Sequence, residues 1–326
     1  MLFHPPKNPV ELKIRHLNEA QTQRREDLME ATQGKAALKQ FKKTMAKKAK
    51  QALKVKTKNK KKHADDQAQV FVLDFDGDIK ATAVKHLREE ISTLISAANK
   101  GDEVVVRLES GGGVVHGYGL AAAQLVRLKD AGLKLTVCVD KVAASGGYMM
   151  ACVADKVVAA PFAIIGSIGV VSQLPNFHKW LKNHDVDYEM FTAGDYKRTV
   201  TVFGENDAED RAKYQEELEQ THELFKHFVN TYRPELDVAK VATGEHWYGE
   251  DALKLNLIDS LQTSDSYILE RMEDNEVYAL YSRQKPTLAE KLGLAQAAEA
   301  TLSMAVDKLP DALARFDLNS RLNILK

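Results

Sequence analysis

From Gln69 onward the chain alternates short apolar runs with apolar stripes at helical spacing. Runs at 70–75, 104–108 and 133–139 have the length and β-branched content of buried strands. Apolar residues then recur at positions 84, 87, 91, 94, 95 and 98, which lie on one face of a helix. Repeated strand, glycine-containing turn and helix predicts an α/β fold with a mostly parallel sheet and outer helices.

Further elements follow in the second half of the chain. Strands are expected at 156–160, 169–172 and 188–192, and a polar helix from about Asp207 to Tyr232. The helix must end there because Pro234 disfavours helical backbone in the residue before it.

The distribution of charge divides the chain into parts. Lys35–Lys62 holds thirteen lysines and no acid, and residues 1–34 carry five charges of each sign. Since the whole chain is neutral, residues 63–326 carry a net charge of about −13. We expect a polar, lysine-rich linker at 1–66, an α/β body at 67–285, and an amphipathic tail at 286–326.

The lysine tract favours an anionic membrane surface as its partner. Its one aromatic residue, Phe41, does not make the interleaved aromatic pattern of a nucleic-acid module, so nucleic acid is a weaker candidate. A merely solvated segment is a further alternative. No run of eighteen uninterrupted apolar residues is present, so no spanning helix is predicted within the sequence.

Cysteine count and motif spacing exclude several classes of protein. Cys138 and Cys152 are the only cysteines, which excludes a disulfide scaffold, and both are expected to be buried. The run Gly111–Gly113 lacks the Lys-Ser/Thr of a phosphate-binding loop. His222 and His227 are five residues apart, which does not place them on one zinc-binding face. We therefore expect no metal and no cofactor.

Two glycine-rich turns follow predicted strands, where helix N-termini offer free N–H donors. Gly112 and Gly113 form the first turn, and Ser145 precedes Gly146 in the second. Ser145 is either a nucleophile beside an oxyanion-binding N–H or simply a helix N-cap. His116 is either a base or a polar surface residue. The pattern alone leaves both questions open.

Four segments then carry a resemblance to a known family. They read VRLESGGG at 106–113, AASGGY at 143–148, GSIGV at 166–170 and GDYK at 194–197. In this order they resemble the motifs of the signal peptide peptidase A family of serine proteases, peptidase family S49, over residues 68–285. The family usually has proline where Gly111 stands here.

The resemblance implies a fold like that of Clp protease and crotonase, and a Ser/Lys dyad. Ser145 is then the nucleophile, Lys197 the general base, and Ser167 the hydroxyl that orients the lysine. Oxyanion donors would be the N–H groups of Gly146 and of the glycine turn, where the spacing to Ser145 favours Gly113 over Gly112. Lysine accepts a proton only when neutral, so Lys197 needs an environment that lowers its pKa.

The same resemblance implies a membrane-associated endopeptidase that cleaves signal-peptide remnants or unfolded and membrane-derived chains. It implies homo-oligomeric rings whose active sites combine residues from neighbouring subunits. It also implies a membrane-spanning segment ahead of this sequence, in the bacterial inner membrane, with the lysine tract keeping the catalytic body on the cytoplasmic side. The alternatives are a non-catalytic membrane adaptor that binds anionic lipid and a crotonase-like acyl-CoA enzyme.

Overall fold

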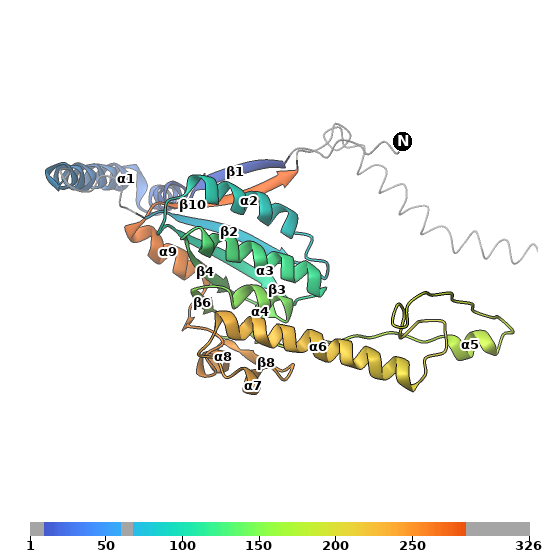
Figure 1. The fold of residues 1–326 in the computed structure, drawn as a ribbon. Helices are drawn as coiled ribbons and strands as arrows, with labels where there is room; N and C mark the ends of the chain where they lie inside the picture. The colour runs from blue at the N-terminus through green and yellow to red at the C-terminus, as the bar shows by residue number, and fades with distance from the viewer. Residues whose placement is uncertain (1–9, 60–67, 285–326) are drawn as a thin grey trace, which may run out of the picture. The chain divides into compact units, whose positions relative to one another are not determined.

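A computed structural model describes residues 10–59 and 68–284 and has a mostly parallel sheet at its centre (Figure 1). The main strand order is β1-β10-β2-β3-β4-β6-β9, and the neighbours from β10 to β9 run parallel. The strands are β1 (Val10–His16), β2 (Val70–Gly77), β3 (Glu103–Ser110), β4 (Lys134–Val139), β6 (Lys156–Ala159), β9 (Ser260–Leu261) and β10 (Val277–Gln284). This order confirms the predicted α/β fold.

Three short strands extend the sheet beside the glycine turns. β5 (Val142–Ala144) pairs parallel with β3 and with β7 (Ile164–Gly166), and β7 pairs antiparallel with β8 (His246–Tyr248). Residues 13–281 form one compact unit. The second unit has only 10–12 and 282–284 among its described residues.

Helices pack on the sheet because this contact removes their apolar faces from water. In α2 (Val84–Ala97) the predicted stripe buries Leu87, Ile91 and Leu94, each burial contributing about 1.5–3 kcal/mol. α2 packs beside α3 (Val115–Asp130), as Figure 1 shows. α9 (Ser264–Asp274) packs Tyr267 and Ile268 on a separate core cluster of strand residues: Val70, Val72, Val105, Cys138, Val158 and Val277.

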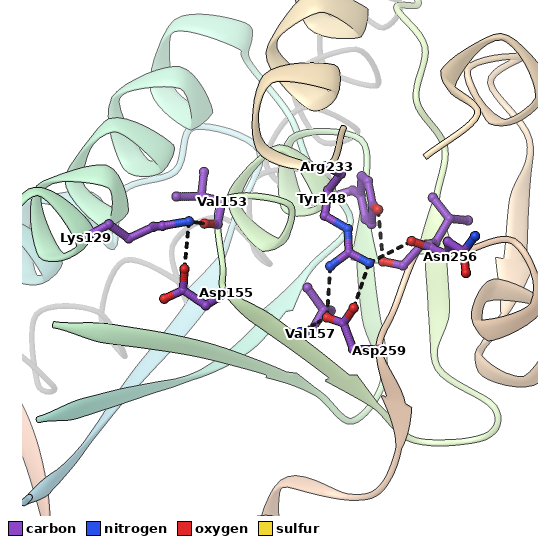
Figure 2. Close-up of polar contacts among 9 residues, drawn as sticks. Lys129, Tyr148, Val153, Asp155, Val157, Arg233, Asn256 and Asp259 are labelled. Carbon is purple, nitrogen blue, oxygen red and sulfur yellow. Dashed lines mark hydrogen bonds and ion pairs between the residues drawn. The ribbon is translucent and has the colours of Figure 1, made fainter. Parts of the chain in front are cut away.

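The long polar helix is α6 (Ala208–Tyr232), as predicted. Asp207 and Asp210 form a reciprocal capping box at its start. At its end, Arg233 donates to both carboxylate oxygens of Asp259, at 2.9 and 3.0 Å, and to the Asn256 carbonyl at 2.7 Å (Figure 2). Asp259 also accepts the Val157 N–H at 2.6 Å. This cluster fastens the end of α6 to the edge of the sheet.

α1 (Leu17–Asn59) is interrupted at Gly34, whose φ of 80° and ψ of 171° are not helical. Lys42 lies 2.8 Å from Glu26, and the Arg25 guanidinium lies 4.6 Å from the centre of the Phe41 ring. In a straight helix residues sixteen positions apart are about 24 Å apart, so the chain must reverse at Gly34. The lysine tract therefore begins the second helix of a helical hairpin. Within the described residues no helix is both long and apolar enough to cross a membrane.

Two predicted strands are wrong. Residues 169–172 and 188–192 have no strand structure. Their β-branched and aromatic residues favour a strand only where a neighbouring strand can pair with them, and this chain offers none there. The remaining helices are α4 (Gly146–Ala151), α5 (His178–Lys182), α7 (Val238–Val241) and α8 (Gly249–Lys254). The tail predicted at 286–326 lies outside the described residues.

Candidate active site

Ser145 occupies a strained turn between β5 and α4. Its φ of 52° and ψ of −118° are rare for a residue with a side chain, and such strain is concentrated at functional sites. Its N–H donates to the Gly166 carbonyl at 2.8 Å, and its carbonyl accepts the Met149 N–H at 2.9 Å. Its hydroxyl makes no capping hydrogen bond, so the backbone holds the residue and leaves the oxygen uncommitted.

The first glycine turn lies directly against this serine. A Cβ at Gly112, whose φ is +87°, would lie 2.6 Å from the Gly146 nitrogen and 2.8 Å from the Ser145 Cβ. Only glycine fits there without displacing the turn. The Gly112 N–H is already used, because it donates to Ser110 Oγ at 3.1 Å. Within residues 68–284, the N–H groups of Gly113 and Gly146 donate to no hydrogen bond.

Ser145 opens on a cavity of about 930 Å³. Gly112, Gly113, Gly146 and Ser167 line it together with apolar side chains. The apolar lining includes Ile79, Val114, Val115, Met149, Val170, Val171, Leu224 and Phe225. A mostly apolar lining with a few polar groups is typical of a ligand-binding pocket.

Ser167 is brought beside Ser145 by strand pairing. Ala144 pairs with Gly166 in the β5–β7 ladder, so each serine directly follows a paired residue. Ser167 also has a positive φ, 51°, and its N–H donates to the Glu245 carbonyl at 2.7 Å. The two serines therefore share one cavity although twenty-one residues separate them.

Lys197 lies outside the cavity onto which Ser145 opens. It is exposed, its N–H donates to the Gly194 carbonyl at 3.1 Å, and it does not line the cavity. The neighbouring Tyr196 ring lies 4.8 Å from the Lys213 Nζ. Lys213 precedes the cavity residue His222 by nine positions, about 13 Å along α6. Within one chain the described structure does not bring Lys197 to Ser145.

The segment around Lys197 exposes an unusual number of large apolar side chains. In Figure 1, α5 and its flanking loops extend beyond the start of α6. The exposed large apolar side chains between 171 and 203 are Val171, Leu174, Phe177, Trp180, Val186, Tyr188, Met190, Phe191, Tyr196 and Phe203. We call residues 171–203 the arm. So much exposed apolar surface is typical of a protein interface.

The cavity also contains residues that the sequence did not single out as site residues. Thr221 and Phe225 reach it from α6, and Thr243 and Gly244 from the loop after α7. His222, considered only as a metal ligand, lines the cavity with its Nε2 3.2 Å from the Ile168 carbonyl. Helical spacing could have placed Thr221 and Phe225 near His222, but not beside Ser145.

Other candidate residues lie away from this chemistry. His116 is exposed at the start of α3 and does not line the cavity. Cys138 and Cys152 are buried, as predicted, and burial raises the pKa of each thiol to about 12. Among the described residues, no group of three His, Cys, Asp or Glu side chains is arranged to hold a metal ion.

Comparison with known proteins adds two family matches and several relatives. Residues 127–278 match the model of peptidase family S49, and residues 4–125 match that of the peptidase family S49 N-terminal region. A probable protease SohB from Haemophilus influenzae is 58% identical over 240 residues, covering 74% of this chain and 68% of the relative. A probable protease SohB from Buchnera aphidicola is 58% identical over 210 residues, covering 64% of this chain and 62% of the relative. Among solved structures, a membrane-bound stomatin-specific protease in complex with a substrate peptide has a TM-score of 0.44 at 13% identity, over 70% of this chain and 96% of that one.

Proposed function

Because the chain belongs to peptidase family S49 and is therefore a serine peptidase, we propose that Ser145 is its nucleophile. The resemblance read from the four motifs is confirmed at the level of the family. Membership favours hydrolysis of peptide bonds over the adaptor and acyl-CoA alternatives. The residues that perform the reaction are our proposal.

One observation carries the assignment of Ser145. Its strained backbone presents an uncommitted hydroxyl to the cavity, and the N–H groups of Gly113 and Gly146 beside it have no partner in the described chain. In the proposed reaction Ser145 Oγ attacks the scissile carbonyl, and the two N–H groups stabilise the oxyanion that forms. The amine leaves with a proton from the base, and water then hydrolyses the acyl-enzyme.

We propose Lys197 of a neighbouring subunit as the base. Two features support a shared site: Lys197 lies outside the cavity of its own chain, and it belongs to the arm, whose apolar side chains need a partner surface. Burial in a homo-oligomeric interface would favour the neutral amine that can accept the serine proton. We assign to Ser167, which lines the same cavity as Ser145, the role of holding that amine.

The cavity lining supports the substrate class that we propose. An extended, largely apolar peptide from an unfolded or membrane-derived chain, such as a remnant signal peptide, would cover its exposed walls. We assign membrane association to the lysine tract, where Lys39, Lys43 and Lys47 are exposed on the second helix of the hairpin formed by α1. The proposed location is the bacterial inner membrane, with the body facing the cytoplasm.

Single and mixed variants test the proposal. Ser145→Ala and Lys197→Ala should each abolish cleavage of an unfolded protein while leaving the thermal melting midpoint unchanged. Co-expressed at equal levels, the two variants should recover about a quarter of the wild-type rate, the fraction of interfaces that combine an intact serine with an intact lysine. Full activity in either single variant would refute the dyad. No recovery in the mixture would refute the shared site.

A further inference from the structure

A chain of buried hydrogen bonds lies beneath the glycine turn and has no role in the proposed chemistry. The Gly112 N–H donates to Ser110 Oγ at 3.1 Å. Ser110 Oγ lies 2.5 Å from Tyr118 Oη, and Tyr118 Oη donates to the Asp78 carbonyl at 2.7 Å. Ser110 and Tyr118 are 2% and 0% exposed, so water cannot replace these bonds.

The two outer hydrogen bonds each have a fixed direction, because a backbone N–H donates and a carbonyl accepts. A phenol has one O–H, and Tyr118 uses it on the Asp78 carbonyl. Ser110 Oγ also lies 3.3 Å from the Gly77 carbonyl, so its one proton is directed either to that carbonyl or to Tyr118 Oη. In both arrangements Ser110 Oγ keeps a lone pair that accepts the Gly112 N–H. Burial raises the pKa of Tyr118, so the phenol stays protonated at neutral pH and donates to the Asp78 carbonyl.

The Tyr118 ring contacts the second glycine turn, at Gly146. A Cβ added at Gly146 would overlap the Tyr118 ring, so the ring lies flush against the residue that follows the nucleophile. The space around the hydroxyl is equally tight. A Cβ at Gly77 would lie 2.5 Å from Ser110 Oγ and 2.6 Å from Tyr118 Oη. Tyr118 thus contacts Gly146 with its ring, and its hydroxyl is linked through Ser110 to the turn at 112–113.

We propose that Tyr118, acting through Ser110, is a positioning residue that sets the spacing between the two oxyanion donors, Gly113 N–H and Gly146 N–H. This inference rests on the proposed function. The Ser110 hydroxyl accepts the Gly112 N–H and so holds the turn in one conformation. The next N–H, that of Gly113, is the one left free. Tyr118 itself exchanges no proton with the substrate.

Tyr118→Phe tests this directly, because it keeps the ring against Gly146 and removes the link to Ser110 and Asp78. The oxyanion forms only in the transition state, so kcat should fall about tenfold or more while KM stays within about twofold. A peptide aldehyde, whose hemiacetal presents the same oxyanion, should bind more weakly by the factor lost in kcat/KM. A merely structural role would not move kcat apart from KM in this way.

Tyr267→Phe is the matched control. It also removes a buried tyrosine hydroxyl, one that donates to Glu103 Oε1 at 2.6 Å in the core cluster packed on α9. We expect Tyr267→Phe to lower the melting midpoint while kcat stays at the wild-type value. Ser110→Ala breaks the same chain from the other side and should lower kcat like Tyr118→Phe. The double variant should have a kcat no lower than that of the slower single variant, because either substitution alone already breaks the series of hydrogen bonds.

Wild-type kcat in both Tyr118→Phe and Ser110→Ala would overturn the proposal, as would a loss of kcat in Tyr267→Phe equal to theirs. Where Tyr118→Phe does not fold, Ser110→Ala decides alone. Ser145→Ala separates this inference from the assignment on which it rests. An active Ser145→Ala refutes the nucleophile itself, whereas an inactive Ser145→Ala with a fully active Tyr118→Phe and Ser110→Ala refutes only the positioning role.

Discussion

Replacing Asp259 by asparagine should loosen the end of α6 from the sheet (Figure 2). Asp259 Oδ2 accepts from Val157 N at 2.6 Å and from Arg233 at 2.9 Å, and Oδ1 accepts from Arg233 at 3.0 Å. Asn keeps the shape of this side chain but loses its charge, and its amide nitrogen then faces a donor instead of accepting from one.

The magnitude follows from the burial of the pair. The Arg233 side chain is 11% exposed and that of Asp259 36% exposed. Removing one partner of a fully buried ion pair costs about 3–5 kcal/mol, and solvent at Asp259 reduces this, so we expect a loss of about 2 kcal/mol in the free energy of unfolding. For a domain of this size that corresponds to a melting midpoint lower by about 4–8 °C.

Thermal unfolding followed by circular dichroism measures the effect. Asp251→Asn is the control, since it removes the same charge from an exposed pair with Lys254 and should leave the midpoint unchanged. A drop in Asp259→Asn no larger than in this control would refute the reasoning that the cluster fastens α6. Because α6 supplies Thr221, His222 and Phe225 to the cavity, KM should rise as well.

Three further predictions concern separate parts of the chain. Gly112→Ala should reduce kcat by about a hundredfold, because its Cβ would lie 2.6 Å from the Gly146 nitrogen; steady-state kinetics with unchanged kcat would contradict this. Partial burial lowers the pKa of His16, but hydrogen bonds to Glu276 and Glu19 outweigh it and the net shift is upward. The stability that wild type has over His16→Gln should therefore be complete below pH about 6.5 and disappear as the pH rises through the folded pKa, and melting midpoints that differ equally at all pH values would exclude the pairing. Cys138 and Cys152, whose pKa burial raises to about 12, should resist a thiol reagent at pH 8 until the protein unfolds. Rapid modification of either thiol in the native protein would show that it is accessible.

The elements that the sequence predicted well are those whose burial is local and periodic. The stripe through Leu87, Ile91 and Leu94 predicts α2 because a helix buries one face wherever it packs. Asp207 with Asp210 marks the start of α6 through contacts within a single turn. In both cases the decisive interactions lie a few residues apart, so the pattern contains them.

What the sequence could not show depends on partners far along the chain. The pairing of β5 with β7 places Ser167 beside Ser145, but strands of three residues have too little pattern to be recognised. Tyr118 reads as one more apolar residue of a helical stripe, and only the fold places its hydroxyl over Ser110 and Asp78. The apolar run at 188–192 is typical of a strand, yet its surroundings in this chain offer no neighbour to pair with.

The most direct test of the central claim is the intact mass of the protein after treatment with a serine-reactive fluorophosphonate. Wild type should gain one adduct per chain, peptide mapping should place it on Ser145, and Ser145→Ala should gain none. An adduct of equal occupancy in Ser145→Ala, or undiminished cleavage of unfolded protein by that variant, would contradict the assignment of Ser145 as the nucleophile.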